Sequence, residues 1–247
     1  MKTRAPSSRS TPASADLSAQ IAKAIRDAIV EGRMIMGERL PSEAELAGQF
    51  GVSRPTVREA LKRLAAQSLI RTQRGAHGGA FVNRLSFEDA RAQQITTATL
   101  LLSMNEVSFE TACEARYALE RAATRLAAER RAQTHLATMR AEIARQQDAA
   151  LGDEGFCASD VAFHRALVDA AGNPVLSYQL AGAVEAMQPL MNMITFTARS
   201  REAIVGFHAR IADALEAQDA DIAETALDAL AAYTLQLGRT IAATPRG

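Results

Sequence analysis

The chain has 247 residues, of which 48% are hydrophobic and 23% charged, and this balance excludes a wholly disordered protein. No run of about 18 uncharged apolar residues occurs, so we expect no membrane span. Residues 1–15 are rich in Ser, Pro, Ala and Arg without an apolar stretch, which predicts a flexible tail rather than a secretory signal. The two cysteines, Cys113 and Cys157, give neither a metal-binding spacing nor a disulfide framework, which favours a cytoplasmic protein.

The net charge of zero hides an uneven distribution along the chain. Residues 1–84 carry 14 Lys/Arg and 7 Asp/Glu, whereas residues 85–247 carry 14 Lys/Arg and 21 Asp/Glu. A basic third joined to an acidic remainder predicts two domains with different partners, and the basic one is suited to phosphates. We therefore expect two domains, over residues 16–84 and 85–242, of which the first is the one suited to nucleic acid.

The first two predicted helices of the basic domain have clear boundaries. Five apolar residues recur at helical spacing in the first one: Leu17, Ile21, Ile25, Ala28 and Ile29. Ser14 or Asp16 is expected to cap its start, and Gly32 ends it. Ser42 and Glu45 match the S-x-x-E capping box that begins a second helix, with Leu46, Ala47 and Phe50 on one face.

The third predicted helix, at about 54–67, follows Gly51 and the N-cap Ser53. Val57, Leu61 and Leu64 are expected to point inward. The residues expected to point outward are Arg54, Thr56, Arg58, Lys62 and Arg63. Two short helices around Gly51 are typical of a helix-turn-helix. Strands at 69–73 and 80–83 around a glycine-rich turn complete a predicted winged helix.

Three segments in order resemble the GntR superfamily of bacterial transcription regulators: LPSE at 40–43, GVSRPTVREAL at 51–61, and a glycine-rich wing ending at Phe81-Val82. The resemblance covers about residues 17–83. It implies that Ser53, Arg54, Thr56 and Arg58 contact DNA, and that Arg74 and Gly75 reach the minor groove from the wing, with His77 as a further candidate. Arginine suits guanine edges or phosphates, and first-turn hydroxyls suit phosphate oxygens. We expect Glu59 to orient Arg58.

The remainder of the chain predicts an all-α bundle of six to seven helices with room for a pocket between them. The expected helices span 86–103, 107–131, 133–150, 153–172, 174–197, 200–217 and 219–241.

Four short motifs in this region resemble the FadR-type branch of the superfamily, whose effector domain is called FCD. They are RYALE at 116–120, DVAFH at 160–164, GNP at 172–174, and FH at 207–208 followed by AL at 214–215 and Asp219. Many members of that branch hold a divalent metal with one Asp and three His. By resemblance, Asp160, His164 and His208 are three of these ligands, whereas the expected third histidine position is Leu230.

Two interpretations of this cluster remain open. Asp160 and His164 are four residues apart on one helix face and could share one ion with His208, for which Zn²⁺, Ni²⁺ and Mn²⁺ are all suitable. Alternatively, Asp160 and His164 form a hydrogen-bonded pair in a polar pocket without metal.

Arg116, Asn173 and Tyr233 are candidates for binding an organic-acid effector, because an arginine fork suits a carboxylate. The alternatives are an intrahelical Arg116–Glu120 pair and a turn role for Asn173 ahead of Pro174.

Together these features predict a ligand-responsive regulator, most consistent with a repressor, that binds a palindromic double-stranded DNA operator as a homodimer and senses a small molecule in its helical domain. A metal-dependent enzyme and an effector-independent DNA-architectural protein are the alternatives. No nucleophile motif or phosphate-binding loop favours an enzyme.

Overall fold

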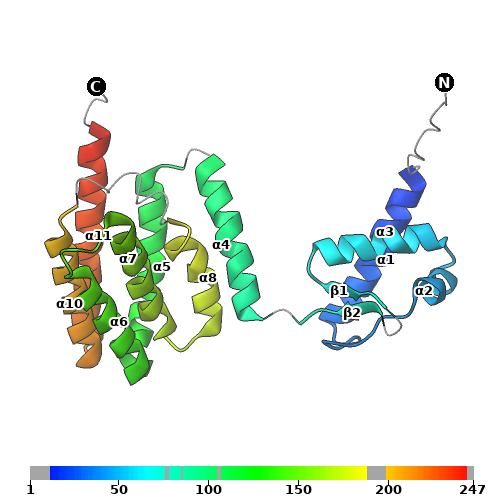
Figure 1. Cartoon of the computed structure of the whole chain (residues 1–247), viewed down its shortest axis with the longest axis horizontal. Helices are drawn as coiled ribbons and strands as arrows, with labels where there is room; N and C mark the ends of the chain where they lie inside the picture. Colours follow the sequence, from blue (N-terminus) through cyan, green and yellow to red (C-terminus); the bar gives the residue numbers. More distant parts are fainter. Residues whose placement is uncertain (1–11, 76–77, 85, 105–106, 188–198, 244–247) are drawn as a thin grey trace. The chain divides into compact units, whose positions relative to one another are not determined.

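The computed structural model describes residues 12–75, 78–84, 86–104, 107–187 and 199–243 (Figure 1). The chain divides into two compact units, Met1–Ser86 and Phe87–Gly247, and each is described by itself. In the described residues, no helix is long and apolar enough to cross a membrane. Cys113 and Cys157 are both buried and unpaired.

Three helices form the core of the N-terminal unit: α1 (Pro12–Val30), α2 (Glu43–Phe50) and α3 (Arg54–Ala66). Ile21, Ile25, Leu46, Val57 and Leu64 are buried between them. The first helix begins at Pro12, so the tail expected over residues 1–15 is helical from residue 12 onward. Proline suits a first helical position because its fixed φ is already helical and its missing N–H is not needed there. Residues 1–11 lie outside the described part.

The helix boundaries around the turn between α2 and α3 are those that the sequence predicts. Ser42 and Glu45 form the complete capping box at the start of α2. Gly51 ends α2 with a φ of 64°, in the left-handed region that glycine occupies without strain. Ser53 caps α3 and accepts a hydrogen bond from the backbone N–H of Thr56. This turn fixes how the two helices of the predicted helix-turn-helix are joined.

Three side chains of the N-terminal unit differ from the expected pattern. Leu17 and Phe50 are 42% and 39% exposed, respectively, so neither belongs to the core. Thr56 is only 8% exposed, although it was expected to point outward. Its hydroxyl lies 2.8 Å from the Ser53 hydroxyl, so the two side chains cap the helix together.

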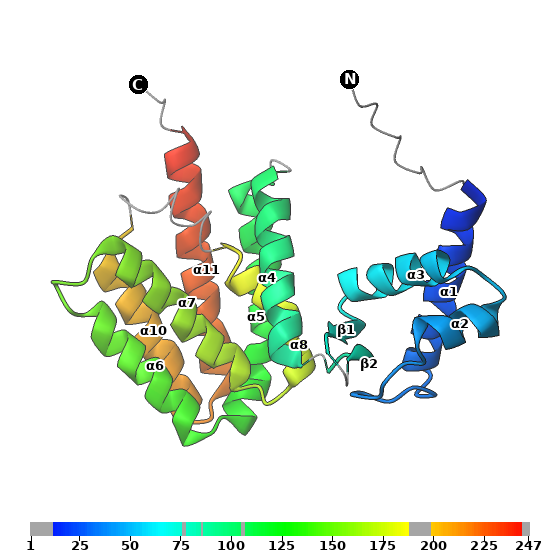
Figure 2. The same cartoon turned by 45° about the vertical axis from the view of Figure 1, so that its right-hand side comes forward.

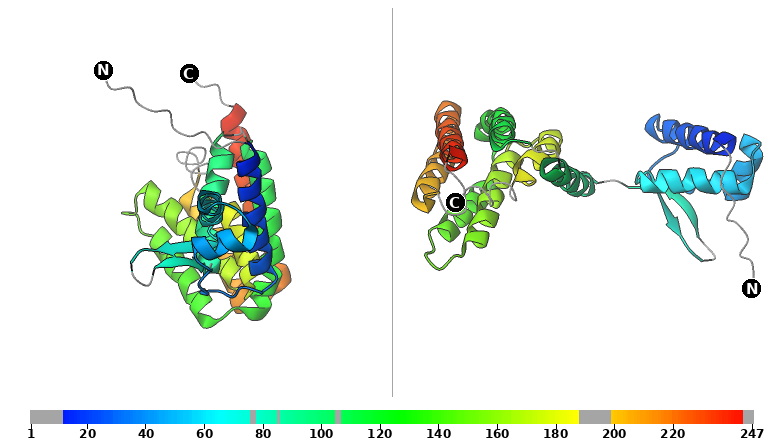
Figure 3. Two further views of the ribbon diagram at one scale, coloured as in Figure 1. Left: turned by 90° about the vertical axis from the view of Figure 1, so that its right-hand side faces the viewer. Right: turned by 90° about the horizontal axis from the view of Figure 1, so that it is seen from above.

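The wing is an antiparallel hairpin of β1 (Ile70–Gln73) and β2 (Gly79–Val82), in which Ile70 pairs with Val82 (Figure 3, right). A third segment, unforeseen from the sequence, pairs with the outer edge of β2 through a bridge between Arg39 and Phe81. The wing therefore gains a partner strand from the segment just before α2. Of the turn between the strands, residues 76–77 lie outside the described part, and His77 with them.

Seven helices are described in the C-terminal unit (Figures 1 and 2). They are α4 (Phe87–Met104), α5 (Phe109–Arg130), α6 (Gln133–Gln146), α7 (Asp153–Asp169), α8 (Pro174–Val184), α10 (Arg201–Glu216) and α11 (Ala220–Ala243). No strand occurs in the described residues of this unit. The helix expected over 174–197 ends as α8 at Val184, and residues 188–197 of that span lie outside the described part.

The core of this unit lies between α5, α6, α7, α10 and α11, whose buried side chains include Phe156, Phe163, Leu167, Ile211 and Leu215. Figure 2 shows α11 running alongside α5 and α10. In contrast, α4 packs mainly on α8, and none of its residues is buried. The helices that enclose the core are therefore also the ones from which the candidate ligand residues project.

Candidate DNA interface and effector site

The residues expected to contact DNA lie at the start of α3 and on the wing. Ser53, Arg54 and Arg58 are exposed, as are Arg74 and Gly75. Thr56 is the exception, because its hydroxyl is turned toward Ser53. Four basic or polar groups and one wing glycine are therefore available at the surface.

Arg58 is held by an acid that sequence reasoning did not assign to it. Its Nε donates to Oε1 of Glu43 at 2.9 Å, and its Nη2 donates to Oε2 of the same carboxylate at 2.6 Å. Glu59, the acid expected to orient Arg58, pairs instead with Lys62 at 2.8 Å on the same helix. Glu43 belongs to the LPSE segment at the start of α2, and only the packing of α2 on α3 brings it to Arg58.

Two glycines of the wing, Gly78 and Gly79, are needed because a side chain at either position would clash within the domain. A Cβ atom at Gly78 would lie 2.5 Å from the Gln73 carbonyl oxygen, and one at Gly79 would lie 2.9 Å from Nε of Arg39. Gly75 differs, because it has a φ of 107° and a Cβ atom there would meet nothing within 4 Å. Of these three glycines, Gly75 is therefore the one best suited to a close approach to another molecule.

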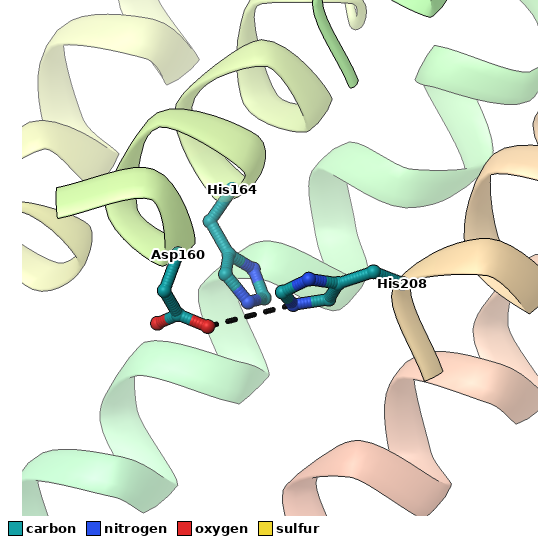
Figure 4. Close-up of side chains that lie close together, drawn as sticks. All are labelled: Asp160, His164 and His208. Atoms are coloured by element: carbon teal, nitrogen blue, oxygen red, sulfur yellow. Dashed lines mark ion pairs between the residues drawn. The ribbon is translucent and has the colours of Figure 1, made fainter. Parts of the chain in front are cut away.

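In the C-terminal unit, Asp160, His164 and His208 converge (Figure 4). Asp160 and His164 project from α7, and His208 projects from α10 toward them. One ligand atom from each of the three residues lies within 4.8 Å of the other two. All three side chains are buried, and their N, N and O donor atoms suit a divalent transition metal.

Each histidine is oriented by a hydrogen bond from its Nδ1. Nδ1 of His164 donates to Oε2 of Glu120 at 2.5 Å, and Nδ1 of His208 donates to Oε1 of Gln146 at 2.8 Å. Phe163 stacks on the His208 ring with centroids 3.9 Å apart. A proton fixed on Nδ1 leaves Nε2 for a ligand, which is how metal-binding histidines are commonly arranged.

The electrostatics of this cluster favour ionised acids and a neutral His208. Burial lowers the pKa of His208 to about 3, against the attraction of Asp160. Burial would raise the pKa of Asp160, but His164, His208 and Arg116 outweigh it and the pKa is lowered. Nε2 of His208 is buried without a hydrogen-bond partner in the described residues, and Oδ1 of Asp160 lies 3.5 Å away. An unpartnered basic nitrogen facing a carboxylate is the arrangement that a metal ion would complete.

Arg116 belongs to this cluster as the partner of Glu120. Both side chains are fully buried, and Nε of Arg116 lies 2.6 Å from Oε1 of Glu120. Glu120 thus holds Arg116 with one oxygen and His164 with the other, and its pKa falls to about 2 because His164 and Arg116 outweigh the effect of burial. This is the intrahelical pair that the spacing offered as the alternative to an effector contact.

The other two effector candidates have structural contacts of their own. Asn173 caps α8, since its Oδ1 accepts hydrogen bonds from the backbone N–H groups of Val175 and Leu176. The Tyr233 hydroxyl accepts a hydrogen bond from the Ser200 backbone N–H at 2.8 Å, which ties α11 to the start of α10. Tyr233 nevertheless lines a cavity beside Asp160, whereas Asn173 is occupied as a cap.

That cavity has a volume of about 10 Å³. Its lining residues are Tyr117, Asp160, Arg199, Ile204, Leu230, Tyr233, Thr234 and Leu237. Leu230 is 1% exposed and presents an aliphatic group where the resemblance places a third histidine. Arg199, which sequence reasoning missed, contributes a guanidinium beside Asp160, while its Nη2 contacts the Cys157 sulfur.

Comparison with known proteins agrees with both units. Residues 17–82 match the family described as bacterial regulatory proteins, gntR family, and residues 111–232 match the FCD domain. The galactonate operon transcriptional repressor of Escherichia coli is 32% identical over 224 residues, which cover 85% of this chain and 91% of the relative. The putative L-lactate dehydrogenase operon regulatory protein of Escherichia coli is also 32% identical, over 85% of this chain and 82% of the relative.

Among solved structures, a GntR protein of Streptococcus agalactiae is similar with a TM-score of 0.53 and 21% identity, over 90% of this chain and 99% of that one, and shows the fold alone. The relatives are regulators rather than enzymes, so the enzyme alternative is excluded. The chain belongs to the GntR family of bacterial transcription regulators, with an FCD effector domain, and is a ligand-responsive DNA-binding regulator.

Proposed function

We propose that the protein is a repressor that releases its operator when a 2-hydroxycarboxylate binds at a divalent metal held by Asp160, His164 and His208. The relatives named above carry the words galactonate and L-lactate in their names, and both compounds are 2-hydroxycarboxylates. The observation that carries the proposal is the unpartnered, buried Nε2 of His208 beside the Asp160 carboxylate.

The metal-free interpretation of the cluster has less support. A hydrogen-bonded Asp160–His164 pair was the alternative, but the hydrogen bonds in the described residues join His164 to Glu120 and His208 to Gln146. The 3.5 Å separation of Asp160 and His208 is long for a hydrogen bond. When bound, a divalent ion would supply Lewis acidity that favours a chelating carboxylate and hydroxyl.

The balance of charge around the cluster also suits an anionic effector. Arg116 and Glu120 neutralise each other, which leaves the Asp160 carboxylate and the Arg199 guanidinium facing the cavity. A divalent ion bound at the ligand cluster would leave an excess of two positive charges, which a carboxylate reduces to one. Arg199 is then the arginine placed to receive the carboxylate, in the role first expected of Arg116.

The small cavity links effector binding to a change in conformation. A volume of about 10 Å³ holds roughly one water-sized group, so a hydroxy acid must displace part of the cavity wall. A ligand that binds one arrangement of the helices better than another shifts the population between them. Such a shift is what a ligand-dependent change in operator affinity requires.

At the DNA, we propose that Ser53, Arg54, Arg58, Arg74 and Gly75 make the contacts, with Thr56 contributing through its cap on α3. A dimer would place two such units on the half-sites of a palindromic operator. Leu100, Leu101 and Met104 of α4 are 55%, 57% and 75% exposed, which gives the C-terminal unit apolar surface for self-association. Sedimentation of the full chain gives its mass in solution and hence tests the dimer.

Elemental mass spectrometry of the purified, untagged chain tests the metal site. After incubation with Zn²⁺, Ni²⁺ or Mn²⁺ and removal of free ion, the wild type is expected to retain one of these metals near one equivalent. His208→Ala is expected to lose it, and His135→Ala, a histidine outside the cluster, is the matched control. Negligible metal in the wild type, or equal metal in His208→Ala, would contradict the site.

A further inference from the structure

The Glu43–Arg58 pair joins the two helices of the helix-turn-helix at the surface. The carboxylate of Glu43 meets the edge of the guanidinium formed by Nε and Nη2, with one oxygen on each nitrogen. The Arg58 and Glu43 side chains are 57% and 34% exposed. The hydrogen bond from Arg58 lowers the pKa of Glu43, so the acid stays ionised at neutral pH. The pair is therefore fixed in geometry but open to a third molecule.

A guanidinium has five N–H groups, and this carboxylate uses only two of them. The edge formed by Nη1 and Nη2 still has two parallel N–H groups, one on each nitrogen. Two parallel donors match the O6 and N7 acceptors of guanine in the major groove. Glu43 therefore leaves Arg58 with one bidentate donor edge in a restrained orientation.

Charge favours a base over a phosphate at that edge. A phosphate there would bring a second anion close to the Glu43 carboxylate, and the paired guanidinium has little net charge to attract it. A guanine edge is uncharged and pays no such penalty. Holding the side chain before DNA arrives also reduces the rotamer entropy that a free arginine loses on binding.

Arg54 provides the contrast within the same helix. It is exposed, and no hydrogen bond or ion pair of its side chain is found in the described part of the chain, although its charge also attracts the Glu43 carboxylate and helps to lower the pKa of that acid. It lies in the first turn of α3, where the positive end of the helix dipole favours an anion such as a phosphate. Arg54 would then supply affinity by contacting a phosphate, and Arg58, four residues later and restrained by Glu43, would supply specificity by contacting a base.

We propose that Glu43 determines sequence specificity by holding Arg58 so that its remaining edge reads one guanine in each half-site. The inference rests on the proposed contact of Arg58 with DNA. Glu43 acts here as a positioning residue, since it touches Arg58 and leaves the base to that side chain.

The test uses the full chain and two DNA probes. One is the duplex that the wild type selects most strongly from a pool of randomised sequences, and the other is a duplex of scrambled sequence. Affinities for both are measured over a range of salt, together with affinities for single-base substitutions across the selected site. Glu43→Gln is compared with Glu59→Gln, which removes the same charge from a neighbouring pair that does not hold Arg58.

Glu43→Gln is expected to reduce discrimination at one guanine by about tenfold and to leave discrimination at the other positions unchanged. Glu59→Gln is expected to keep the full base preference. Arg58→Ala is expected to lose the same guanine preference with little change in the slope of log affinity against log salt, whereas Arg54→Ala reduces that slope by about 0.9. Circular dichroism establishes that each variant is folded.

Three outcomes would overturn the inference. The first is an unchanged base preference in Glu43→Gln. The second is equally tighter binding of this variant to both duplexes, which would show that Glu43 only repels DNA. The third is a salt slope that falls by about 0.9 in Arg58→Ala, which would make Arg58 a phosphate contact. If the wild type selects no sequence from the pool, the proposed DNA contact itself fails, which is a different result from these three.

Discussion

Each unit pairs an arginine with a glutamate, but the two pairs lie in opposite environments. Arg58 and Glu43 meet at the surface of the N-terminal unit, where both remain accessible to DNA. Arg116 and Glu120 meet in the interior of the C-terminal unit, where both are fully buried. The surface pair leaves donor groups for a partner, whereas the interior pair supports a neighbouring histidine.

Burial decides what each pair contributes. An exposed ion pair gains little because water screens its charges, so its value lies in orientation. A buried pair cannot lose one member without leaving an uncompensated charge in a low-dielectric interior. The same Glu→Gln substitution is therefore expected to alter DNA recognition when made in the surface pair and to lower the stability of the effector unit when made in the buried pair.

The largest expected effect is that of Glu120→Gln. The change leaves the buried charge of Arg116 without its counter-ion, and the one remaining carbonyl oxygen cannot accept from both Arg116 and His164, so we expect a loss of about 3–5 kcal/mol of stability. Hydrogen exchange of the α5 and α7 amides measures it in the full chain. Glu43→Gln, the same substitution at the surface, is expected to leave the exchange of α2 and α3 close to that of the wild type.

A double variant sharpens this prediction. In Arg116→Met with Glu120→Gln no buried cation remains without a partner, so most of the lost protection is expected to return. If Glu120→Gln alone exchanged like the wild type, the buried pair would not support the effector unit and the contrast with the surface pair would fail.

The next effect concerns metal affinity rather than stability. Gln146→Leu removes the oxygen that accepts a hydrogen bond from Nδ1 of His208. The proton of the ring is then no longer held on Nδ1, so Nε2 is no longer kept unprotonated for a metal. Loss of such an outer partner is expected to weaken metal binding by about 10–100-fold. Titration calorimetry with Zn²⁺ measures this, and Gln147→Leu, an adjacent glutamine that is exposed, is the control. Equal affinities in the two variants would remove Gln146 from the site.

The smallest effect is local to the N-terminal unit. Ser42→Ala breaks the capping box of α2 and is expected to cost about 1 kcal/mol. We expect faster hydrogen exchange in α2 and no change in α5 and α7. Ser103→Ala, at an exposed position in α4, is the matched control. Slower exchange throughout the chain, or no change in α2, would show that the box does not hold this helix.

The fold could be predicted from the sequence wherever a signal is local. The capping box at Ser42, the left-handed turn at Gly51 and the cap at Ser53 each depend on a few adjacent residues, and all are present in the structure. The segment before α2 that pairs with β2 was missed, because a single bridge at Arg39 leaves no alternation to detect.

The candidate site was predictable only in part, for the same reason. Asp160 and His164 share a helix, so their spacing places them together, and His208 followed from the resemblance. Glu120 and Gln146 come from two other helices, and their contacts with His164 and His208 depend on how α5, α6, α7 and α10 pack. Glu43 was likewise recognised as part of the LPSE segment, but its contact with Arg58 depends on how α2 and α3 pack and could not be predicted from the sequence.

The most direct test of the whole account is the affinity of the full chain for its selected duplex, measured by fluorescence anisotropy in Zn²⁺ with increasing galactonate or L-lactate. We predict that at least one of these acids releases the wild type from DNA, and that His208→Ala binds the duplex with unchanged affinity but is not released. If neither acid affects the wild type, or if His208→Ala is released equally, the metal cluster is not the effector site and the account is contradicted.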